Sequence, residues 1–384
     1  MIIKISKQNY LKVTLYLMIL FLIRPGYILH TSLAIFFNIG AYITQIIVLF
    51  LFCIYFKKII FDLLPFFFYY FFLFFSTFIN DGNLIECFKQ NSTLLTAIIL
   101  FEIFLKIDKK ILLGSRLIFE ICTYINLISI ILFPNGLYST LNYSSNWFLG
   151  FNNIHIRTTL PGLLLSYMYT YTYNGKIDFR SILLNISIIL SSVLVGSTTS
   201  ILGIVLFNLF FILMKLDIFS INCYFVIIFI GIMNLLLFVQ SKLNIISFFV
   251  VNILHKDITF TGRNVIWANA INSLNKHIII GRGFLTDNDF VNLLFNKLAT
   301  HPHNFLLYIL MMGGLVLMFI FIWILYLSLY KLKENEKFDC SKVLLSGIYS
   351  FLIMGLTESL VGTKFLFPLF VLALNIKLFR NMEV

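Results

Sequence analysis

Long apolar runs recur from one end of the chain to the other, and they constrain its fold more than any other feature. A bilayer core about 30 Å thick is crossed by roughly 20 residues of helix. Of the 384 residues, 60% are hydrophobic and 11% are charged, whereas a soluble domain carries about 25% charged residues. The 16 acidic and 28 basic residues are too few to cover a soluble core of this length. The sequence therefore excludes a soluble globule and predicts an all-α polytopic membrane protein.

The apolar runs predict about twelve transmembrane helices within a single integral membrane domain, residues 1–384. The stretch from Ile182 to Met214 is the difficult one, because it would form a helix about 50 Å long. That length is too great for one crossing and short for two, so we expect two crossings or one re-entrant hairpin. The predicted spans are Val13–Ile28, Leu33–Phe56, Ile59–Ile79, Thr93–Ile107, Leu117–Phe133, Leu160–Tyr173, Ile182–Val195, Ser200–Met214, Ile221–Val239, Phe305–Tyr330, Val343–Val361 and Phe365–Phe379.

Basic residues are distributed unevenly among the predicted loops. With the N-terminus inside, 18 of the 28 basic residues lie in cytoplasmic segments, including Lys57 and Lys58 in a short turn between two spans. Six of the others lie in one long outer loop, and long translocated loops are largely exempt from the positive-inside rule. The short loops therefore divide 18 to 4, which predicts cytoplasmic N- and C-termini. Topology thus explains the net charge of +12, and no nucleic-acid partner is predicted.

Two outer connections are long, Pro134–Thr159 and a large extracytoplasmic loop at residues 240–304. Long ordered loops are usually functional. A capping box is predicted at Thr286 and Asp289, ahead of a short helix. A second amphipathic helix, lying on the membrane or against the bundle, is predicted where apolar residues recur at helical spacing, at Trp267, Ile271, Leu274 and Ile278.

The outer loops also contain arginines that suit an anionic ligand. The large loop has six basic and three acidic residues, and it includes Arg263 and Arg282, while Arg157 lies in the other long loop. A guanidinium group holds phosphate oxygens through paired charge-assisted hydrogen bonds and stays protonated. The alternative, that these arginines anchor the protein to lipid headgroups, stays open for each of them.

His303 is the candidate general base. It lies in the segment His301-Pro302-His303-Asn304, at the mouth of the span that begins at Phe305. A histidine with an ordinary pKa near 6.5 can accept a proton from a sugar hydroxyl. The alternative is a polar cap on the helix. A zinc site at His301 and His303 lacks convincing further ligands, so no metal and no cofactor is predicted.

Glu358 is an ionisable residue near the outer end of a predicted span. Such residues at membrane depth are functional candidates by default. A simple ion pair with Lys364 is the alternative. Glu102 lies in another span, but Lys106 one turn later offers it a structural partner. We therefore predict a supporting catalytic role for Glu358 and none for Glu102.

Three motifs together resemble the O-antigen ligase and polymerase superfamily, which includes the Wzy-type polymerases. They are Thr-Gly-Arg-Asn-Val-Ile-Trp at residues 261–267, Ile-Gly-Arg-Gly-Phe at residues 280–284, and His303-Asn304 followed by Gly314. The remaining resemblance is in hydropathy, with about twelve spans and one large late outer loop. Two departures are the Leu315 that follows Gly314 and a turn at residues 196–200 that lacks the arginine many members carry. Both weaken a ligase assignment more than a superfamily assignment.

The resemblance implies a metal-independent membrane glycosyltransferase, working at the outer face of the bacterial cytoplasmic (inner) membrane. Its substrate would be an undecaprenyl-diphosphate-linked oligosaccharide, with a chain-length regulator and a flippase as possible partners in lipopolysaccharide or capsule synthesis. Arg263, Arg157 and Arg282 would bind the diphosphate, His303 would act as the base, and Glu358 would orient it. The expected activity is that of a repeat-unit polymerase. The alternatives are a ligase that transfers glycan to lipid A core and, in another class, a lipid-linked glycan flippase.

Overall fold

The computed structural model describes residues 7–140, 143–218, 220, 226–235, 263–297, 299–360 and 362–382. Within these ranges the chain forms helices and loops, and its only strand-like pairing is two isolated β-bridges, Tyr138–Asn146 and Trp147–Gly150. The predicted all-α class is thus confirmed. Five of the described helices are long and apolar enough to cross a membrane, and the predicted number of twelve spans is not confirmed. These five are Ala34–Ile79, Leu84–Ile107, Lys109–Leu132, Thr198–Lys215 and Phe305–Glu334.

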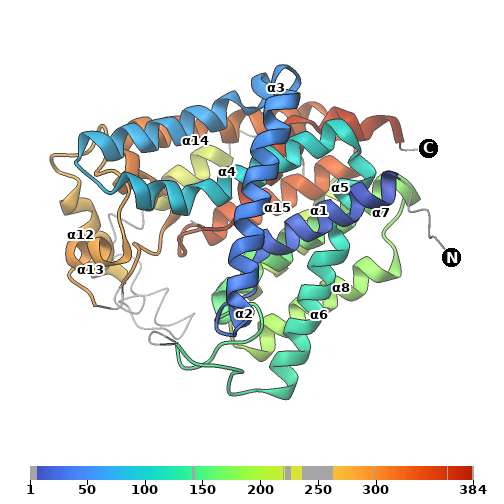
Figure 1. Ribbon diagram of the computed structural model, residues 1–384, viewed down its shortest axis with the longest axis horizontal. Helices are drawn as coiled ribbons and strands as arrows, with labels where there is room; N and C mark the ends of the chain where they lie inside the picture. Colours follow the sequence, from blue (N-terminus) through green and yellow to red (C-terminus); the bar gives the residue numbers. More distant parts are fainter. Residues whose placement is uncertain are drawn as a thin grey trace.

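The helices follow one another along the chain, with longer connections between α6 and η1 and between α12 and α13 (Figure 1). Three shorter apolar helices accompany the five long ones, and one of them, at Val226–Leu235, carries no label. The labelled elements are α1 (Lys7–Ile23), α2 (Gly26–Leu29), α3 (Ala34–Ile79), α4 (Leu84–Ile107), α5 (Lys109–Gly114), α6 (Arg116–Leu132), η1 (Asn152–Ile154), α7 (Ile156–Asn174), α8 (Phe179–Leu194), α9 (Thr198–Lys215), α12 (Arg263–Ser273), α13 (Asp287–Leu294), α14 (Phe305–Glu334), α15 (Asp339–Met354), α16 (Leu366–Leu374) and η2 (Ile376–Met382).

Helix α3 differs from the prediction, because it continues through Lys57 and Lys58 where a turn between two spans was expected. No Gly or Asn lies between Ala41 and Ile79 to end the helix, and it continues through Pro65, so the chain bends instead of breaking. Figure 1 shows α3 changing direction sharply at the top of the view. Its outward side chains are apolar, and Phe61 is 83% exposed. Such a surface is suited to lipid rather than to water.

The stretch predicted as two crossings or a re-entrant hairpin contains two helices, α8 and α9. They are separated at Gly196, and Ser197 caps the second helix by accepting a hydrogen bond from the Ser200 backbone N–H. The two helices contact each other. The chain therefore turns back near Gly196, and this turn is directed toward the loop that carries Asn152.

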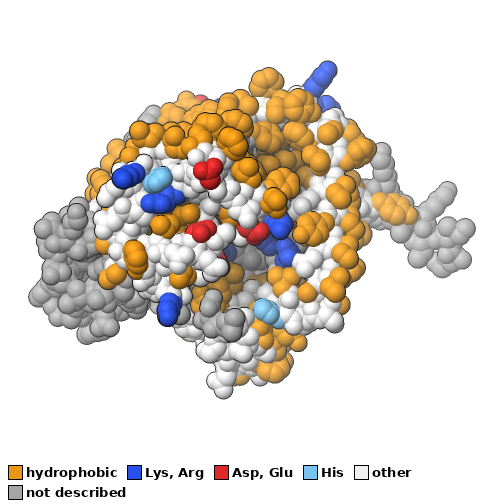
Figure 2. All heavy atoms as spheres, turned by 60° about the vertical axis from the view of Figure 1, so that its left-hand side comes forward, with side chains coloured by type: hydrophobic (Ala, Val, Ile, Leu, Met, Phe, Trp, Pro, Cys, Tyr) orange, Lys and Arg blue, Asp and Glu red, His pale blue; other side chains and the backbone are white. Residues whose placement is uncertain are grey.

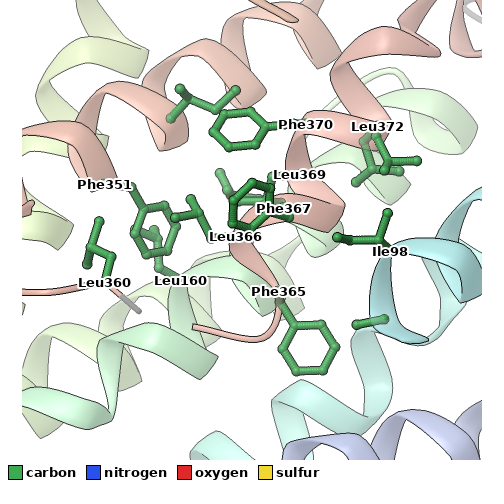
Figure 3. Close-up of a cluster of buried hydrophobic side chains, with 14 of the residues drawn as sticks. Ile98, Leu160, Phe351, Leu360, Phe365, Leu366, Phe367, Leu369, Phe370 and Leu372 are labelled. Atoms are coloured by element: carbon green, nitrogen blue, oxygen red, sulfur yellow. The ribbon is translucent and has the colours of Figure 1, made fainter. Parts of the chain in front are cut away.

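Helix α16 lies at the centre of the core (Figure 3). Its side chains are buried on every side, since Leu369, Phe370 and Leu372 are at most 1% exposed. Around it pack Ile98 of α4, Leu160 of α7 and Phe351 of α15, as Figure 3 shows. The packing of α15 and α16 fixes both ends of the loop between them, and this loop carries Glu358.

Different helices lie at the two ends of the molecule. In Figure 1 the start of α1 and the C-terminal helix η2 lie toward the right, whereas α12 and α13 lie at the opposite, left end. Helix α14 runs from the left end, and its last turn contains Lys331 and Lys333. The structure therefore separates the lysine-rich end of α14 from the segment that contains His303.

Candidate active site

A buried carboxylate lies where four separate parts of the chain meet. Glu358 is only 4% exposed in its side chain and forms an ion pair with Arg263 of α12, at 3.1 Å between Oε1 and Nη2. Its Oε2 lies 3.8 Å from Nη2 of Arg157 and 3.9 Å from Nδ1 of His303. Asn153 donates a hydrogen bond from Nδ2 to Oε1 at 3.0 Å. We call these five residues the Glu358 cluster.

The cluster carries more positive than negative charge. One carboxylate faces two guanidinium groups, so a positive charge remains even when His303 is neutral. The side chains of Arg157, Arg263 and His303 are 13%, 20% and 23% exposed, so a ligand can reach them although Glu358 is covered. In Figure 2, one face of the molecule shows basic and acidic side chains gathered around a hollow, with hydrophobic side chains above it. Such a partly dry, cationic site favours an anion.

Helix α12 places Arg263 through a buried tryptophan one turn later. Trp267 is fully buried, and its indole N–H donates to the Pro302 carbonyl at 2.8 Å. This contact holds α12 against the segment that contains His303. At the start of the helix, Arg263 donates from Nη1 to the Thr357 carbonyl at 2.6 Å and from Nη2 to Glu358. In the first motif, Arg263 therefore contacts Glu358, and Trp267 attaches the helix to the segment that contains His303.

Asn304 fixes the other side of His303. Its side chain is fully buried, caps α14 by accepting from the Leu307 N–H at 2.8 Å, and donates to the Leu356 carbonyl at 3.0 Å. The loop before Glu358 is therefore tied directly to the start of α14. His303 itself has a positive φ of 49°, an uncommon conformation for a residue with a side chain. Backbone strain of this kind is often found at functional sites.

His301 and His303 differ in their hydrogen bonds. His301 accepts a hydrogen bond at Nδ1 from the His303 backbone N–H, at 3.2 Å. Burial, together with the nearby His303 and Arg157, lowers the pKa of His301 to about 3. By contrast, Nδ1 of His303 is buried with no hydrogen-bond partner among the described residues and faces Glu358. His301 is therefore a neutral support, and His303 has a free nitrogen directed at the carboxylate.

The glycine motifs shape the backbone behind the histidines. Gly281 has a φ of 77°, and a Cβ there would lie 2.5 Å from the Gly314 nitrogen. Gly314 interrupts α14, which the sequence predicted as one continuous span, with a φ of 61° and a ψ of −159°. The interrupted turn receives hydrogen bonds from the backbone, with the Arg282 N–H donating to the Met311 carbonyl at 2.8 Å. The second and third motifs therefore pack directly on each other.

Arg282, the third residue predicted to bind the diphosphate, makes its contacts away from the Glu358 cluster. Its Nε donates to the Ser273 carbonyl at 2.8 Å, and its side chain lines a cavity of about 610 Å³ with Asn80 and His277. None of the contacts of Glu358 described above involves Arg282. Lys364 does not pair with Glu358 in the structure, because it donates to the Leu22 and Ile23 carbonyls instead.

Asn153 and Ser197 belong to the site but were not predicted. Ser197 donates from Oγ to Oδ1 of Asn153 at 2.8 Å, which orients the amide whose Nδ2 binds Glu358. Ser197 lies in the turn between α8 and α9, where many members of the superfamily were expected to carry an arginine. The only sequence signal for Asn153 was its position four residues before Arg157 in a long outer loop.

The amphipathic segments of the large loop were predicted in part. The capping box at Thr286 and Asp289 is confirmed, and α13 buries Phe290 and Leu294 behind it. Helix α12 buries Trp267, but it ends at Ser273, so Ile278 lies beyond it and is exposed. The apolar spacing continues to Ile278, but the helix ends at Ser273 and turns follow from Leu274 to Ile280. The first part of the loop, up to Gly262, lies outside the described residues.

Comparison with protein families gives one match, to the model described as Wzy_C, O-Antigen ligase, over residues 183–322. Residues 183–322 resemble the O-antigen ligase family. The matched region contains Arg263, His303 and all three motifs, and the resemblance to the O-antigen ligase and polymerase superfamily is confirmed. Arg157 and Glu358 lie outside the matched region, yet the structure brings them to it. No curated protein and no solved structure matches the chain.

Residues of the matched region thus meet a carboxylate supplied from outside it. Arg263 and Arg157 present guanidinium groups that suit a diphosphate, and His303 presents a nitrogen that suits proton transfer. Glu358 connects the two functions, because its Oε1 binds Arg263 while its Oε2 faces Arg157 and His303. The arrangement can bind a phosphate group and remove a proton close to it.

We predict that Glu358→Gln destabilises the fold by about 3 kcal/mol, because it leaves two partly buried guanidinium groups without a carboxylate. Thermal unfolding of the detergent-purified protein measures this. Adding Arg263→Gln to Glu358→Gln should recover part of the loss, since it removes one uncompensated charge. Glu334→Gln is the matched control, because its pair with Lys331 is solvent-exposed and contributes little. Equal melting temperatures for Glu358→Gln and Glu334→Gln would contradict the structural role.

Proposed function

We propose that the protein polymerises lipid-linked oligosaccharide repeat units at the outer face of the bacterial inner membrane. The observation that carries the proposal is the convergence of Arg157, Arg263 and His303 on the buried carboxylate of Glu358. The substrate would be an undecaprenyl-diphosphate-linked glycan of an O-antigen or a capsule. The match to the O-antigen ligase family supports a lipid-linked glycan substrate.

The reaction we propose is a single displacement at the anomeric carbon of the donor glycan. The bond from that carbon to the diphosphate oxygen breaks, and the diphosphate leaves with the bonding electrons. Arg263 and Arg157 stabilise the negative charge that grows on it, and this stabilisation increases as the bond opens. The arginines thereby lower the barrier, and no metal ion is needed for the step.

The second half of the proposal concerns the proton of the acceptor hydroxyl. As the hydroxyl oxygen attacks with inversion, its proton passes to Nε2 of His303. Glu358 favours the tautomer that carries hydrogen on Nδ1 and stabilises the imidazolium that forms. The present separation of 3.9 Å is too long for a hydrogen bond, and contacts of this kind often shorten when substrate binds. His301 is a poor base, because its pKa lies far below neutral pH.

A ligase is the second candidate, and the description of the matched family favours it. It would take the same donor and transfer the finished glycan to lipid A core. The chemistry at the Glu358 cluster would be identical, and the acceptor alone would differ. The flippase alternative lacks comparable support, because the cluster is formed by loop and helix-end residues such as Asn153, Arg263 and His303 rather than by the middle of broken spans.

The orientation in the membrane is open to direct test. We predict that an alkaline phosphatase fusion after Asn288 is active and that one after Lys333 is inactive, with the reverse for a cytoplasmic reporter. Helix α14 has 30 residues, which is about 45 Å of helix and enough to cross between the two points. An active phosphatase at Lys333 would place the Glu358 cluster in the cytoplasm, away from its proposed substrate.

Deletion of the gene, followed by gel analysis of surface polysaccharide, separates the two activities. A polymerase deletion should leave core capped with a single repeat unit, whereas a ligase deletion should leave bare core. Complementation by the wild-type gene controls for effects on neighbouring genes. Unchanged chain length in the deletion strain would contradict both candidates.

A further inference from the structure

A cavity next to the Glu358 cluster has no role in the reaction so far. It is a cavity of about 890 Å³ between the end of α1, the loop around Tyr138 and the turn at Gly362–Phe365. This volume is within the range of pockets that hold small ligands. Arg157 lines it from the first turn of α7, so one residue is shared between the cavity and the cluster.

Two cations in this cavity face each other without an anion. Arg24 and Lys364 both line it, and no Asp or Glu is among its described lining residues. Lys364 donates from Nζ to the Leu22 carbonyl at 2.6 Å, and Arg24 donates to Oδ1 of Asn38. Neither has a carboxylate partner among the described side chains, and Nε of Arg24 is buried with no hydrogen bond to them.

Holding Arg24 and Lys364 close together and partly buried costs free energy unless an anion binds between them. Lys364 lies in the turn between two predicted spans. Burial and the neighbouring Arg24 lower its pKa to about 7. Arg24 also has a positive φ of 50°, so its backbone is held in an uncommon conformation. The hydroxyl of the neighbouring Thr363 is buried and makes no hydrogen bond with the described residues. An anion would satisfy all three side chains at once.

We propose that this cavity is a second anion site, which binds the phosphate groups of the acceptor lipid while the Glu358 cluster binds those of the donor. The proposal rests on the proposed function, because a polymerase joins two lipid-linked glycans and must hold two diphosphates. Arg157 lies between the sites and brings the two lipid heads close together.

The lining of the cavity suits a diphosphate that carries a sugar. With an anion bound, Arg24 and protonated Lys364 together carry two positive charges, which match a diphosphate better than a single carboxylate. Next to them, Tyr143 and Phe151 stack at 3.9 Å between ring centroids, and Tyr138 packs on His30 at 4.7 Å. These rings offer flat apolar faces with polar edges, on which a sugar ring can lie. The ligand class is therefore a glycosylated phosphate or diphosphate at the membrane surface.

The test is the binding stoichiometry of geranylgeranyl diphosphate on the purified full-length protein, which needs no transfer activity. We expect two equivalents for the wild type and one for Arg24→Gln/Lys364→Gln, with affinity at the lost site reduced at least tenfold. Lys331→Gln/Lys333→Gln, at the far end of α14, is the control and should keep both equivalents. Melting curves establish that each variant is folded, and Lys364→Arg should retain the second equivalent because it keeps the charge.

Each outcome has a distinct meaning. Two equivalents in Arg24→Gln/Lys364→Gln, or one equivalent in both that variant and the wild type, would overturn the second site and leave the proposed function standing. Arg263→Gln alone should lose the equivalent that binds at the Glu358 cluster. Two equivalents in Arg263→Gln would overturn the diphosphate role of that cluster instead. Displacement of the second equivalent by phosphorylated lipid A core at lower concentration than by lipid-linked repeat units would keep the anion site and make the acceptor that of a ligase.

Discussion

Replacing His303 with Ala is expected to abolish visible polysaccharide chains while the protein stays folded in the membrane. Loss of a general base typically lowers a rate about a hundredfold to ten-thousandfold. The variant should accumulate lipid-linked single repeat units, which can be extracted and counted by mass spectrometry. His303 is suited to this role because its Nδ1 faces Glu358 and its neighbour Asn304 anchors the start of α14.

His301→Ala is the matched control, and it should retain activity within several-fold of the wild type. Its ring accepts one hydrogen bond from the backbone of His303 and has a pKa too low for proton transfer at neutral pH. The opposite pattern, an inactive His301→Ala and an active His303→Ala, would move the role of the base to His301. Normal chains from the double variant would leave no histidine base in this site.

Arg263→Lys is expected to lower polymerisation about a hundredfold, the scale on which removal of one oxyanion-stabilising donor acts. Arg263 uses one nitrogen to bind the Thr357 carbonyl and another to bind Glu358, and its planar fork can also meet a diphosphate. Lys keeps the charge but has a single nitrogen, so it cannot make these contacts together. Initial rates of chain extension, at equal protein levels, provide the measurement.

A lipid headgroup anchor would behave differently from a catalytic arginine. An anchor needs positive charge at the membrane surface, and Lys supplies it as well as Arg does. Lys297→Gln is a useful companion, because it removes a positive charge from the same loop and should leave the rate unchanged. Normal chain length in Arg263→Lys would therefore make Arg263 an anchor and remove it from the mechanism.

The residues of the candidate site could be predicted from the sequence where their type is unusual for the segment or belongs to a spaced motif. Glu358 was visible because an ionisable group is rare in an apolar span, and Arg263 and His303 because they lie in spaced motifs. Asn153 was not visible, because asparagine is common in loops and only the fold shows it bound to Glu358. The place of the Arg282 side chain was equally hidden, since its motif shows two glycines but not the contact of its guanidinium group with the Ser273 carbonyl.

The fold was predictable to a similar degree. Hydrophobicity identified the all-α class, because it depends only on composition and run length. It did not locate the ends of helices, since the path through Lys57 and Lys58 depends on whether a bend or a break satisfies the backbone, and the break at Gly314 depends on packing against Gly281. The cavity beside Arg24 and Lys364 joins residues at opposite ends of the chain, so only the tertiary structure reveals it.

The most direct test of the account is chain extension by the purified protein in lipid nanodiscs, with lipid-linked repeat units as the only substrate and EDTA present. The wild type should produce a ladder of products spaced by one repeat unit, with one polyprenyl diphosphate released for each bond formed. His303→Ala should produce no ladder under the same conditions. Failure of the wild type to extend the substrate would contradict the proposed polymerase, and an equal ladder from His303→Ala would contradict glycosyl transfer with His303 as the base.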